Sequence, residues 1–571
     1  MKLQVRCILL VAVTLNPLNA LQSGPYNLIF NCDGYAVLHD ANKSYSKWIS
    51  NIFDPLVDSD CDVIFWNDGA GGNTANYKSD ILDLTDYNSS ENMYYVKEMI
   101  NQGIDPPEEV INEANKRSID IFYSYRVNDI HDSFIKSEYP KFKDSNPHWL
   151  IGESNYSGFI NFPSSLNFGV LEVVNLKKKI ISEIIDNYKF DGIELDLMRG
   201  PPYFKFDEIE TKKHMLTDLV RYISKKCKNR GMKLAVRVGE SLESCRLDGF
   251  EVELWLEEDL LDILVLGSGV IDVKVSEFVH LAEGTNVSIY PCIYGWPSKY
   301  YPIPENISNA VAMNFWSQGA SGMYIYNWFL HSPTSQRNSK HMAQSIKQFG
   351  SSEKVFENFI EFCFAADRGG PSREYPNNWL NSKLPHNLSD DNSLELEIPI
   401  HFNFNRFDDV SVDVELSKQP INEISLSINN SPFQILTFKD NKPKLALSSL
   451  ELVNGPNTLK FLSTLAEETL IKKVEVNISR RNNFSASGRT NRLGILSENW
   501  FRNESIGYFY QTNKKWIYSL DHGWLYPHIL SGSTCWFFSF KHGWFFLDQQ
   551  SFANHGLYFL NSSKTWGTIT N

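Results

Sequence analysis

The sequence lacks the short motifs that mark several common enzyme classes. It contains no HExxH helix, no GxSxG nucleophile turn and no phosphate-binding loop. No two of its eight cysteines form a CxxC pair, which argues against a zinc site. These absences disfavour protease, esterase and kinase functions, and we expect neither a metal ion nor a cofactor.

Basic residues and long apolar runs are also scarce. The formal net charge of −14 disfavours nucleic acid as a partner, although a local basic pocket is compatible with it. After the first twenty residues no stretch approaches eighteen apolar residues in a row, so we expect no transmembrane segment. Residues 1–20 are typical of a secretory signal peptide, with Lys2 and Arg6 before apolar Cys7–Leu15 and a small Ala20. We therefore expect a secreted, periplasmic or cell-surface protein.

Eight strand-like segments precede residue 330, and helical patterns separate most of them. Eight such units over about 300 residues predict an α/β fold, a TIM (β/α)8 barrel, which we place at 21–382. A doubly wound sheet is the alternative, but no Gly-rich fingerprint follows the first strand. The strand segments are Asn27–Cys32, Asp62–Asp68, Ile119–Asn128, Phe190–Leu197, Lys233–Glu240, Asp262–Gly267, Val287–Gly295 and Gly322–Phe329. Helices are predicted over Asn175–Tyr188, capped by Asn175, and over Lys212–Arg230 and Ile307–Gly319.

The pattern changes after the barrel. Short alternating segments over 383–479 predict a β-sandwich, and polar residues 480–492 are typical of a linker. In 493–571 the unit Trp516–Trp524 recurs as Trp536–Trp544, which predicts stacked, Trp-rich β-hairpins. These hairpins either bind a sugar or cell wall, giving surface attachment, or pack their aromatic residues in a small domain. We favour the packing role.

Two carboxylates lie two positions apart in FDGIELDLMR, Glu194 and Asp196. Side chains at i and i+2 of a strand share a face, and an unpaired carboxylate is costly inside a sheet. The segment alone fits a salt-bridged pair, for example with Arg199, as well as a catalytic strand. As the fourth of eight strands, it puts Asp196 at the carboxyl rim, where TIM-barrel active sites lie, and Glu194 one layer deeper.

Hydrolysis of a glycosidic bond needs two carboxyl groups that flank the bond. One attacks or activates water, and the other protonates the leaving oxygen. Asp196 as nucleophile and Glu240 as general acid/base form the best pair, because adjacent barrel strands bring their ends together. Alternatively, Glu240 is a surface acid that caps the next helix, since Ser241 and Glu243 follow it.

Polar and aromatic residues at other strand ends complete the candidate site. Aromatic faces stack on sugar rings, while carboxylates and amides bind sugar hydroxyls. The arginines either pair with the carboxylates or bind a sulfate or carboxylate of the substrate. The candidate substrate-binding residues are Trp66, Asn67, Asp68, Arg126, Asn128, Asp129, His131, Glu194, Arg199, Arg237, Tyr294, Trp296, Asn327 and Trp328.

FDGIELDLMR resembles the DGIELDFMR stretch of the bacterial glycosyl-hydrolase-like family 10 group of TIM barrels. With the flanking strands, the similar segments cover roughly 25–345. The resemblance implies a barrel with a glycosidase site more than it implies a particular sugar. The further similar segments are Tyr125–Asp132 (YRVNDIHD), Leu234–Val238 (LAVRV), Trp255–Glu257 (WLE), Asn314–Trp316 (NFW) and Gly319–Tyr324 (GASGMY).

Two other groups imply roles by analogy. The α-amylase and α-glucosidase clans place a nucleophilic Asp at the end of a DGFxxD-like fourth strand, which matches Asp196. The α-amylase clan has its general-acid Glu in a VGE-like context, which matches Glu240, but it has Arg where this chain has Glu194. The layout is also similar to the endo-fucanases of glycoside hydrolase family 168, secreted retaining barrels that cut sulfated fucans.

The sequence therefore predicts a secreted bacterial retaining glycoside hydrolase that acts inside a polysaccharide chain. The similarity to endo-fucanases implies a sulfated α-linked glycan, such as a fucan, as substrate. One alternative is a non-catalytic carbohydrate-binding or cell-surface protein that uses the barrel as a scaffold. Another is an envelope-directed glycosidase on the same barrel.

Overall fold

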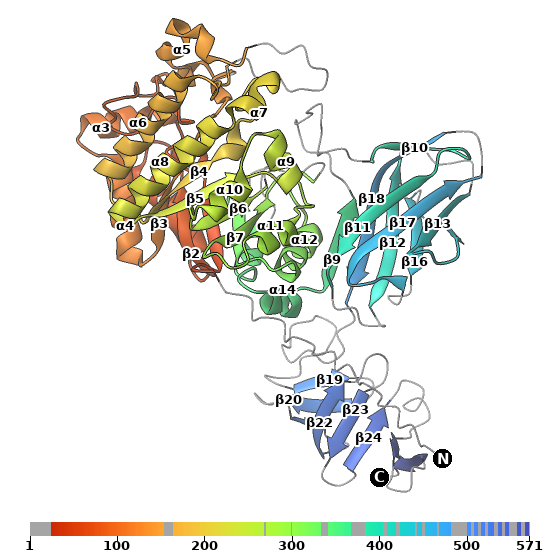
Figure 1. Cartoon of the computed structure of the whole chain (residues 1–571). Coiled ribbons are helices and arrows are strands. Elements are labelled where there is room, and N and C mark those ends of the chain that lie inside the picture. The colour runs from red at the N-terminus through yellow and green to blue at the C-terminus, as the bar shows by residue number, and fades with distance from the viewer. Residues whose placement is uncertain are drawn as a thin grey trace, which may run out of the picture.

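A computed structural model describes most of the chain (Figure 1). The predicted signal peptide lies outside the described residues, as does the predicted linker except for Arg480. The described residues are 24–133, 135–152, 164–267, 270–297, 300–332, 341–366, 383–402, 408–417, 423–439, 442–447, 451–464, 468–480, 500–503, 507–511, 516–519, 523–529, 535–539, 543–547, 557–560 and 566–569. Among them, no helix is long and apolar enough to cross a membrane.

Eight parallel strands close into a barrel in sequential order, which confirms the predicted fold class. Each strand pairs in parallel with the next from β1 to β8, and β8 pairs with β1, with one register shift between Leu28 and Ile29 in the β1–β2 pairing. The strands are β1 (Leu28–Cys32), β2 (Cys61–Trp66), β3 (Asp120–Arg126), β4 (Gly192–Asp196), β5 (Lys233–Val238), β6 (Ile263–Leu266), β7 (Ser288–Tyr294) and β8 (Met323–Tyr326).

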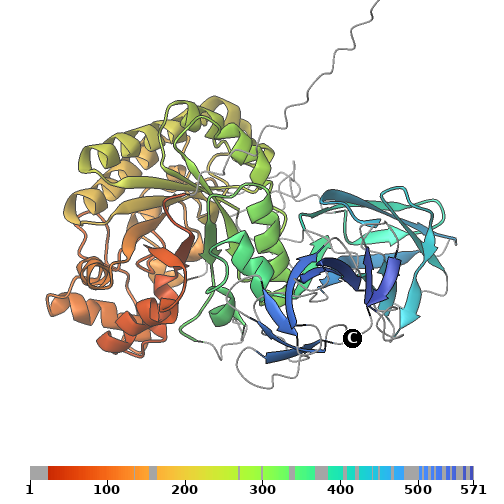
Figure 2. The same cartoon turned by 90° about the horizontal axis from the view of Figure 1, so that it is seen from below.

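Helices surround the barrel, as the end-on view in Figure 2 shows. The sixth helix begins four residues before its predicted start, with Val170 at the N-cap position. Asn175 therefore lies inside this helix and not at its cap, because Val173 and Val174 extend the buried apolar stripe by one turn. The helices are α1 (Gly34–His39), α2 (Tyr45–Phe53), α3 (Tyr95–Asn101), α4 (Pro106–Arg117), α5 (Lys141–Ser145), α6 (Leu171–Asn187), α7 (Ile209–Lys212), α8 (His214–Arg230), α9 (Leu242–Leu247), α10 (Val252–Glu257), α11 (Val275–Leu281), α12 (Glu305–Ser317), α13 (Met342–Ser345) and α14 (Ser352–Asn358).

Alternate residues of the barrel strands face two different cores. On β4, Ile193 and Leu195 point outward into the core shared with the helices, whereas Glu194 and Asp196 have the opposite parity and face the barrel interior. The lower part of the interior is apolar and aromatic, and Phe122 stacks on Phe65 with ring centroids 4.5 Å apart. The buried acids and arginine of these inward positions, such as Glu194, Asp196 and Arg237, lie toward the carboxyl ends of the strands.

A β-sandwich follows the barrel, and it begins earlier than the predicted 383. Strand β9 (Glu361–Ala366) precedes that boundary but pairs along its length with β18 (Thr469–Ser479). The partner strand is about 110 residues away in sequence, and such pairings have no local signal. The remaining strands are β10 (His386–Leu388), β11 (Leu394–Ile400), β12 (Asp409–Leu416), β13 (Ile424–Ile428), β14 (Gln434–Ile435), β15 (Thr437–Lys439), β16 (Lys442–Leu447) and β17 (Gly455–Ser463).

The C-terminal part forms one antiparallel sheet of eight strands in sequential order. Tyr518 pairs with Trp524 across one hairpin, and Phe538 pairs with Trp544 at the equivalent point of the next. The sequence repeat therefore corresponds to a repeated hairpin. The strands are β19 (Trp500–Asn503), β20 (Gly507–Gln511), β21 (Ile517–Ser519), β22 (Gly523–Ile529), β23 (Cys535–Ser539), β24 (Gly543–Leu547), β25 (Leu557–Leu560) and β26 (Trp566–Ile569).

Candidate active site

Asp196 ends β4, and its carboxylate is held in a fixed direction. Its Oδ1 accepts a hydrogen bond from the backbone N–H of Met198 at 3.0 Å, which caps the short 3₁₀ turn η6 (Leu197–Arg199). Its Oδ2 lies 3.4 Å from Nη1 of Arg237, the neighbouring residue in the β4–β5 register. A charge-assisted contact on one oxygen and a peptide N–H on the other fix this carboxylate at the barrel rim.

Arg237 is a fully buried cation that positions Asp196. Its Nε donates to the carbonyl oxygen of Gly267 at 3.0 Å. The guanidinium carbon lies 4.0 Å from the ring centroid of Tyr326 and 5.4 Å from that of Tyr324. Burial lowers the pKa of Arg237, but the charge of Asp196 and neighbouring groups outweighs it and holds the pKa well above its usual value. The contacts of the Arg237 side chain therefore fix it between the ends of the strands.

Glu194 lies one layer deeper and is fully buried. Its carboxylate accepts hydrogen bonds from Ser124 Oγ at 2.5 Å and from the Tyr324 hydroxyl at 2.8 Å, with Asn31 Nδ2 at 3.4 Å. Burial and the negative charge of Asp196 raise the pKa of Glu194 to about 7, against hydrogen bonds from Ser124 and Tyr324 that lower it. Glu194 is therefore a floor residue whose charge changes near neutral pH.

Glu240 lies two residues beyond the end of β5 and is 3% exposed. It is not the cap of the next helix, because Ser241 takes that position and forms a capping box with Ser244. The Glu240 side chain instead lies beside Gly267 at the end of β6, where an added Cβ would be 3.4 Å from Glu240 Cγ. The structure therefore excludes the interpretation in which Glu240 caps the next helix.

Arg237 Nη2 also lies 3.7 Å from the thiol of Cys292 on β7. Burial raises the pKa of Cys292 on β7 to about 12, Arg237 lowers it, and the negative charges of Asp196, Glu194 and Glu240 each raise it further. Arg237 contacts Asp196 through Nη1 and, through Nε, the carbonyl oxygen of Gly267, beside which Glu240 lies. The structure thus places Asp196 at the end of β4 and Glu240 two residues beyond the end of the neighbouring strand β5.

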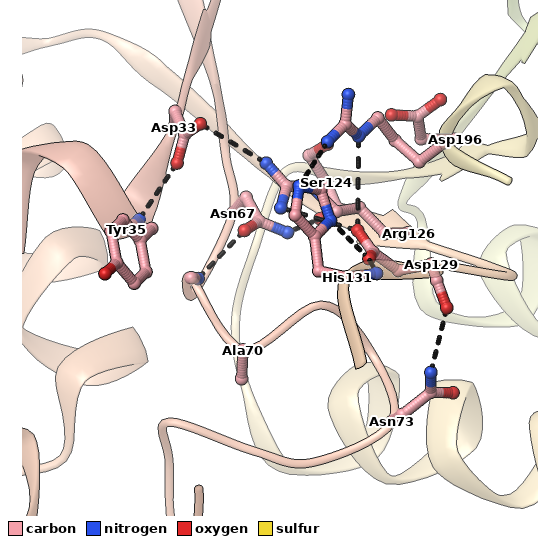
Figure 3. Close-up of polar contacts among 12 residues, drawn as sticks. Asp33, Tyr35, Asn67, Ala70, Asn73, Ser124, Arg126, Asp129, His131 and Asp196 are labelled. Atoms are coloured by element: carbon pink, nitrogen blue, oxygen red, sulfur yellow. Dashed lines mark hydrogen bonds and ion pairs between the residues drawn. The ribbon is translucent and has the colours of Figure 1, made fainter. Parts of the chain in front are cut away.

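A second polar network extends from the end of β3 (Figure 3). Asp129 accepts from the His131 ring Nδ1 at 2.5 Å, and Arg199 Nη2 lies 3.1 Å from His131 Nε2. Arg126 lies 3.5 Å from both Asp129 and Asp33. Burial raises the pKa of Asp129, but His131 and the two arginines outweigh it and hold the pKa below its usual range. The predicted residues Arg126, Asp129, His131 and Arg199 therefore form one network.

Three predicted residues hold loops near the rim. Asn67 donates to the carbonyl oxygen of Ser124 at 3.0 Å and accepts from Gly69 N–H at 2.8 Å. Asp68 is buried, accepts from the backbone N–H groups of two loop residues, and has a pKa raised by burial. Asn128 donates through Nδ2 to the carbonyl oxygens of Leu166 and Pro202 and accepts from the N–H of Leu166. Their contacts are structural.

Two predicted tryptophans lie away from the barrel mouth. Trp66 is fully buried in the outer core, where its ring packs on Tyr123 and Phe190. Trp328 is 2% exposed and packs edge-on against His341 and Phe349. Trp66 has the outward parity of β2, and Trp328 lies beyond the end of β8 in the core shared with the helices, so neither ring is placed where a sugar could stack on it.

Tyr294, Trp296 and Asn327 lie together at the ends of β7 and β8. The Tyr294 and Trp296 rings are partly exposed, with centroids 6.1 Å apart. Asn327 takes a left-handed backbone conformation with φ of 56° and is 6% exposed. Trp296 also contacts Phe329 and Tyr301, and Tyr301 is 56% exposed. The rim at the ends of β7 and β8 is therefore aromatic, whereas the rim at the ends of β3, β4 and β5 is charged.

Among the described residues, Asp129, His131 and Glu138 have ligand atoms close enough to approach a metal ion, all within 4.8 Å of one another. Arg126 and Arg199 already contact Asp129 and His131, so a divalent cation would face two positive charges at short range. Burial and the charge of Asp129 raise the pKa of Glu138 to about 8. The group does not fit a metal ion.

The sequence did not identify several residues that complete the site. Ser124 and Tyr324 hold Glu194, while Tyr326 lies against Arg237. Ser124 had a usable signal, since it lies two positions before Arg126 and so shares its face. In the sequence the two tyrosines cannot be distinguished from ordinary core residues, because only the closed barrel brings them to Glu194 and Arg237.

No protein-family model matches the chain, and no curated protein matches it. Several solved structures are similar. The PgaB (BpsB) glycoside hydrolase domain from Bordetella bronchiseptica has 11% identity and a TM-score of 0.40, over 57% of this chain and 99% of that one. α-L-Fucosidase isoenzyme 2 from Paenibacillus thiaminolyticus has 13% identity and a TM-score of 0.39, over 58% and 49%. The GH36 α-galactosidase AgaA from Geobacillus stearothermophilus has 9% identity and a TM-score of 0.36, over 78% and 56%. This chain spans about half the length of the last two.

Proposed function

We propose that this protein is a glycoside hydrolase that retains anomeric configuration, with Asp196 as nucleophile and Glu240 as general acid/base. The observation that carries the proposal is the pair of buried carboxylates on adjacent strand ends, Asp196 in an ion pair with Arg237 and Glu240 beside Gly267. Neither side chain caps a long helix, and Arg237 contacts both Asp196 and the carbonyl oxygen of Gly267 beside Glu240. Two carboxyl groups that flank one point are what glycosidic cleavage needs.

The first step forms a glycosyl–enzyme ester. Asp196 attacks the anomeric carbon while the glycosidic C–O bond breaks, and Glu240 gives its proton to the leaving oxygen. In the second step Glu240, now a carboxylate, takes a proton from water. That water attacks the same carbon and releases Asp196. Two inversions at one carbon give net retention.

The surrounding residues set the charge of this site. Arg237 stays close to Asp196 through both steps and favours its departure as a carboxylate. Glu194, one layer deeper, bonds Ser124 and Tyr324 and supports the floor on which the sugar rests. The network of Asp129, His131 and Arg199 offers the polar wall on the opposite side.

We further propose that the substrate is a sulfated α-linked glycan such as a fucan, cleaved within the chain by an exported enzyme. Its support is the similarity to endo-fucanases and the two arginines of the network at the end of β3, Arg126 and Arg199. Arginine is suited to sulfate and carboxylate groups. An anionic group would compete with Asp129 and Asp33 for Arg126, whose contacts to them are at 3.5 Å.

Hydrolysis of a panel of sulfated fucans, sulfated galactans and α-glucans tests this function. We expect reducing ends to accumulate with one class, and the freshly released anomer, followed by NMR, to match the substrate. Inversion of configuration would exclude Asp196 as nucleophile. Absence of hydrolysis across the panel, with intact folded protein, would count against the enzyme proposal.

A non-catalytic carbohydrate-binding or surface role is the second candidate. It is favoured by Tyr518 and Trp524 on the C-terminal sheet, which are 36% and 48% exposed and pack at 5.2 Å. Exposed aromatic pairs of this kind can bind sugars or a cell wall. If glycan binding disappears on deletion of 493–571 while no hydrolysis is detected, this role is favoured over catalysis.

A further inference from the structure

A line of aromatic rings leads from the charged mouth of the barrel to the surface. Tyr326, which lies against Arg237, stacks on Tyr294 at 5.5 Å between centroids. Tyr294 lies 6.1 Å from Trp296, and Trp296 lies 5.2 Å from Tyr301. Exposure rises along the line, from 1% at Tyr326 to 56% at Tyr301. The rings thus continue the site outward in one direction.

The segment that carries the outer rings is fixed at its base. The backbone N–H of Ile303 donates to the carbonyl oxygen of Gly295 at 2.8 Å, which closes the segment into a loop. The N–H of Gly295 donates to the carbonyl oxygen of Tyr326 at 2.9 Å. Trp296 is also stacked on Phe329 at 5.2 Å, with the ring planes 21° apart. The Trp296 ring is therefore held by its packing against Phe329.

The same loop is attached to the β-sandwich by the residue before Tyr301. Tyr300 is 6% exposed, and its hydroxyl donates to Glu475 Oε1 on β18 at 2.9 Å. Lys473, also on β18, lies 5.0 Å from the centroid of the Tyr300 ring and 2.9 Å from Glu475 Oε1. Two adjacent tyrosines therefore have different environments, one in the interface with the sandwich and one in solvent.

We propose that Trp296 and Tyr301 form an outer sugar subsite and that the β-sandwich positions it through Tyr300, Glu475 and Lys473. The occupant is a sugar of the same polysaccharide, one or more units from the bond that is cut, so the inference rests on the proposed function. The apolar faces of sugar rings stack on aromatic rings. Because Tyr300 is already held by the sandwich, the neighbouring Tyr301 loses less entropy when the chain binds.

A polymer can use this subsite, whereas a single sugar at the barrel mouth cannot reach it. The structure therefore assigns the sandwich a role in affinity for long substrates and no role in the chemical step. Glu475 and Lys473 are positioning residues, because they act through Tyr300 and do not contact the sugar.

The first experiment substitutes the exposed ring in the full chain, Tyr301→Ala, with the exposed Tyr222→Ala on α8 as matched control. The substrates are a sulfated fucan, or the polysaccharide cleaved best in the panel, and a 4-nitrophenyl glycoside of the same sugar. We expect KM for the polymer to rise about 5- to 10-fold, from the loss of one stacking contact. Turnover number and activity on the aryl glycoside should change less than about twofold. An unchanged KM, or equal losses on both substrates, would overturn the subsite.

Binding separates failure of the subsite from failure of the catalytic proposal. Polysaccharides of the panel are titrated into the full chain carrying Asp196→Asn, with and without Tyr301→Ala. Weaker binding in the double variant supports the subsite even where no hydrolysis is found, and in that case only the catalytic proposal fails. Equal binding by both, or no binding to any panel member, rejects the subsite.

The second experiment tests the sandwich contact. Glu475→Ala removes the acceptor of the Tyr300 hydroxyl, Glu475→Gln keeps an acceptor, and exposed Glu397→Gln on β11 is the control. We expect KM for the polymer to rise about threefold in the Ala variant, from the loss of one hydrogen bond, and less in the Gln variant. The aryl glycoside should be unaffected. A lower Tm with an unchanged polymer KM would show a purely structural contact.

Discussion

The two ends of the barrel interior have opposite chemistry. The lower part holds apolar and aromatic side chains such as Ile29, Val63 and Phe122. The carboxyl end holds buried acids and arginines, which meet as Asp196 with Arg237 and as Asp129 with Arg126. Both ends are made by the same eight strands with the same alternation. The difference indicates that the lower part stabilises the fold while the rim carries the chemistry.

The buried charges of the rim are stable only when they are paired. A charge taken out of water loses several kcal/mol of solvation, which only close pairing offsets. Removing one partner leaves the other charge buried without compensation. Substitutions at the rim therefore need near-isosteric variants, so that loss of activity can be separated from loss of fold.

The largest expected effect is that of Asp196→Asn. The variant keeps the shape and the acceptor for Met198 N–H, but it lacks the attacking carboxylate. We expect the turnover number to fall about 10⁴-fold or more, measured on the substrate found in the panel. Circular dichroism should remain that of wild type. Near-normal turnover would refute the assignment of Asp196.

Glu240→Gln should cost about 10²- to 10⁴-fold on the polysaccharide, because the leaving oxygen is no longer protonated. An aryl glycoside with a good leaving group needs little protonation, so its first step should be nearly unaffected. Comparing the two substrates in one variant identifies the general acid. Equal losses on both would assign Glu240 a different role.

The opposite end of the barrel should respond in stability. Phe122 is fully buried and stacked on Phe65, so Phe122→Ala should lower the free energy of unfolding by about 3–5 kcal/mol. Chemical denaturation of the full chain measures this loss. At temperatures where the variant stays folded, its turnover number should match that of wild type. A large fall in turnover number in the folded variant would show that the lower part of the barrel interior also affects catalysis, which would contradict its purely stabilising role.

Glu194→Gln should give the smallest effect, and it depends on pH. The folded state raises the pKa of Glu194 from 4.5 to about 7, so it binds more protons than the unfolded chain between these values. Stability contributed by this group is present at low pH and falls as pH rises through that window. Unfolding free energies at pH 5 and pH 8 should therefore shift in favour of the Gln variant at the higher pH. A difference between the two proteins that does not change with pH would contradict the raised pKa.

The eight barrel strands could be predicted from the sequence because several are short, near-continuous apolar runs, typical of strands buried on both faces, and helical patterns separate most of them. The start of α6 was predicted wrongly at Asn175, because a good capping residue can also lie inside a helix when tertiary packing extends its apolar face. Strand β9 was missed as part of the sandwich, because its partner β18 lies far along the chain.

The candidate site was predicted in part. Asp196 and Glu240 followed from their places at strand ends, but Trp66 and Trp328 were assigned to the site without knowledge of which way their rings point. Only the barrel register shows that Trp66 faces the helices and that Asn67 faces inward.

The sequence by itself determined the strand and helix pattern, the order of the parts and the strand ends that carry acids. These follow from periodicities of 2 and 3.6 residues, which are local. Only the tertiary structure decided that Ser124 and Tyr324 enclose Glu194, that Glu240 lies beside Gly267, and that Tyr300 reaches the sandwich. The contacts of Glu194 and Tyr300 join residues 70 to 175 positions apart. They depend on how the barrel closes and which strands pair, and no local pattern encodes that.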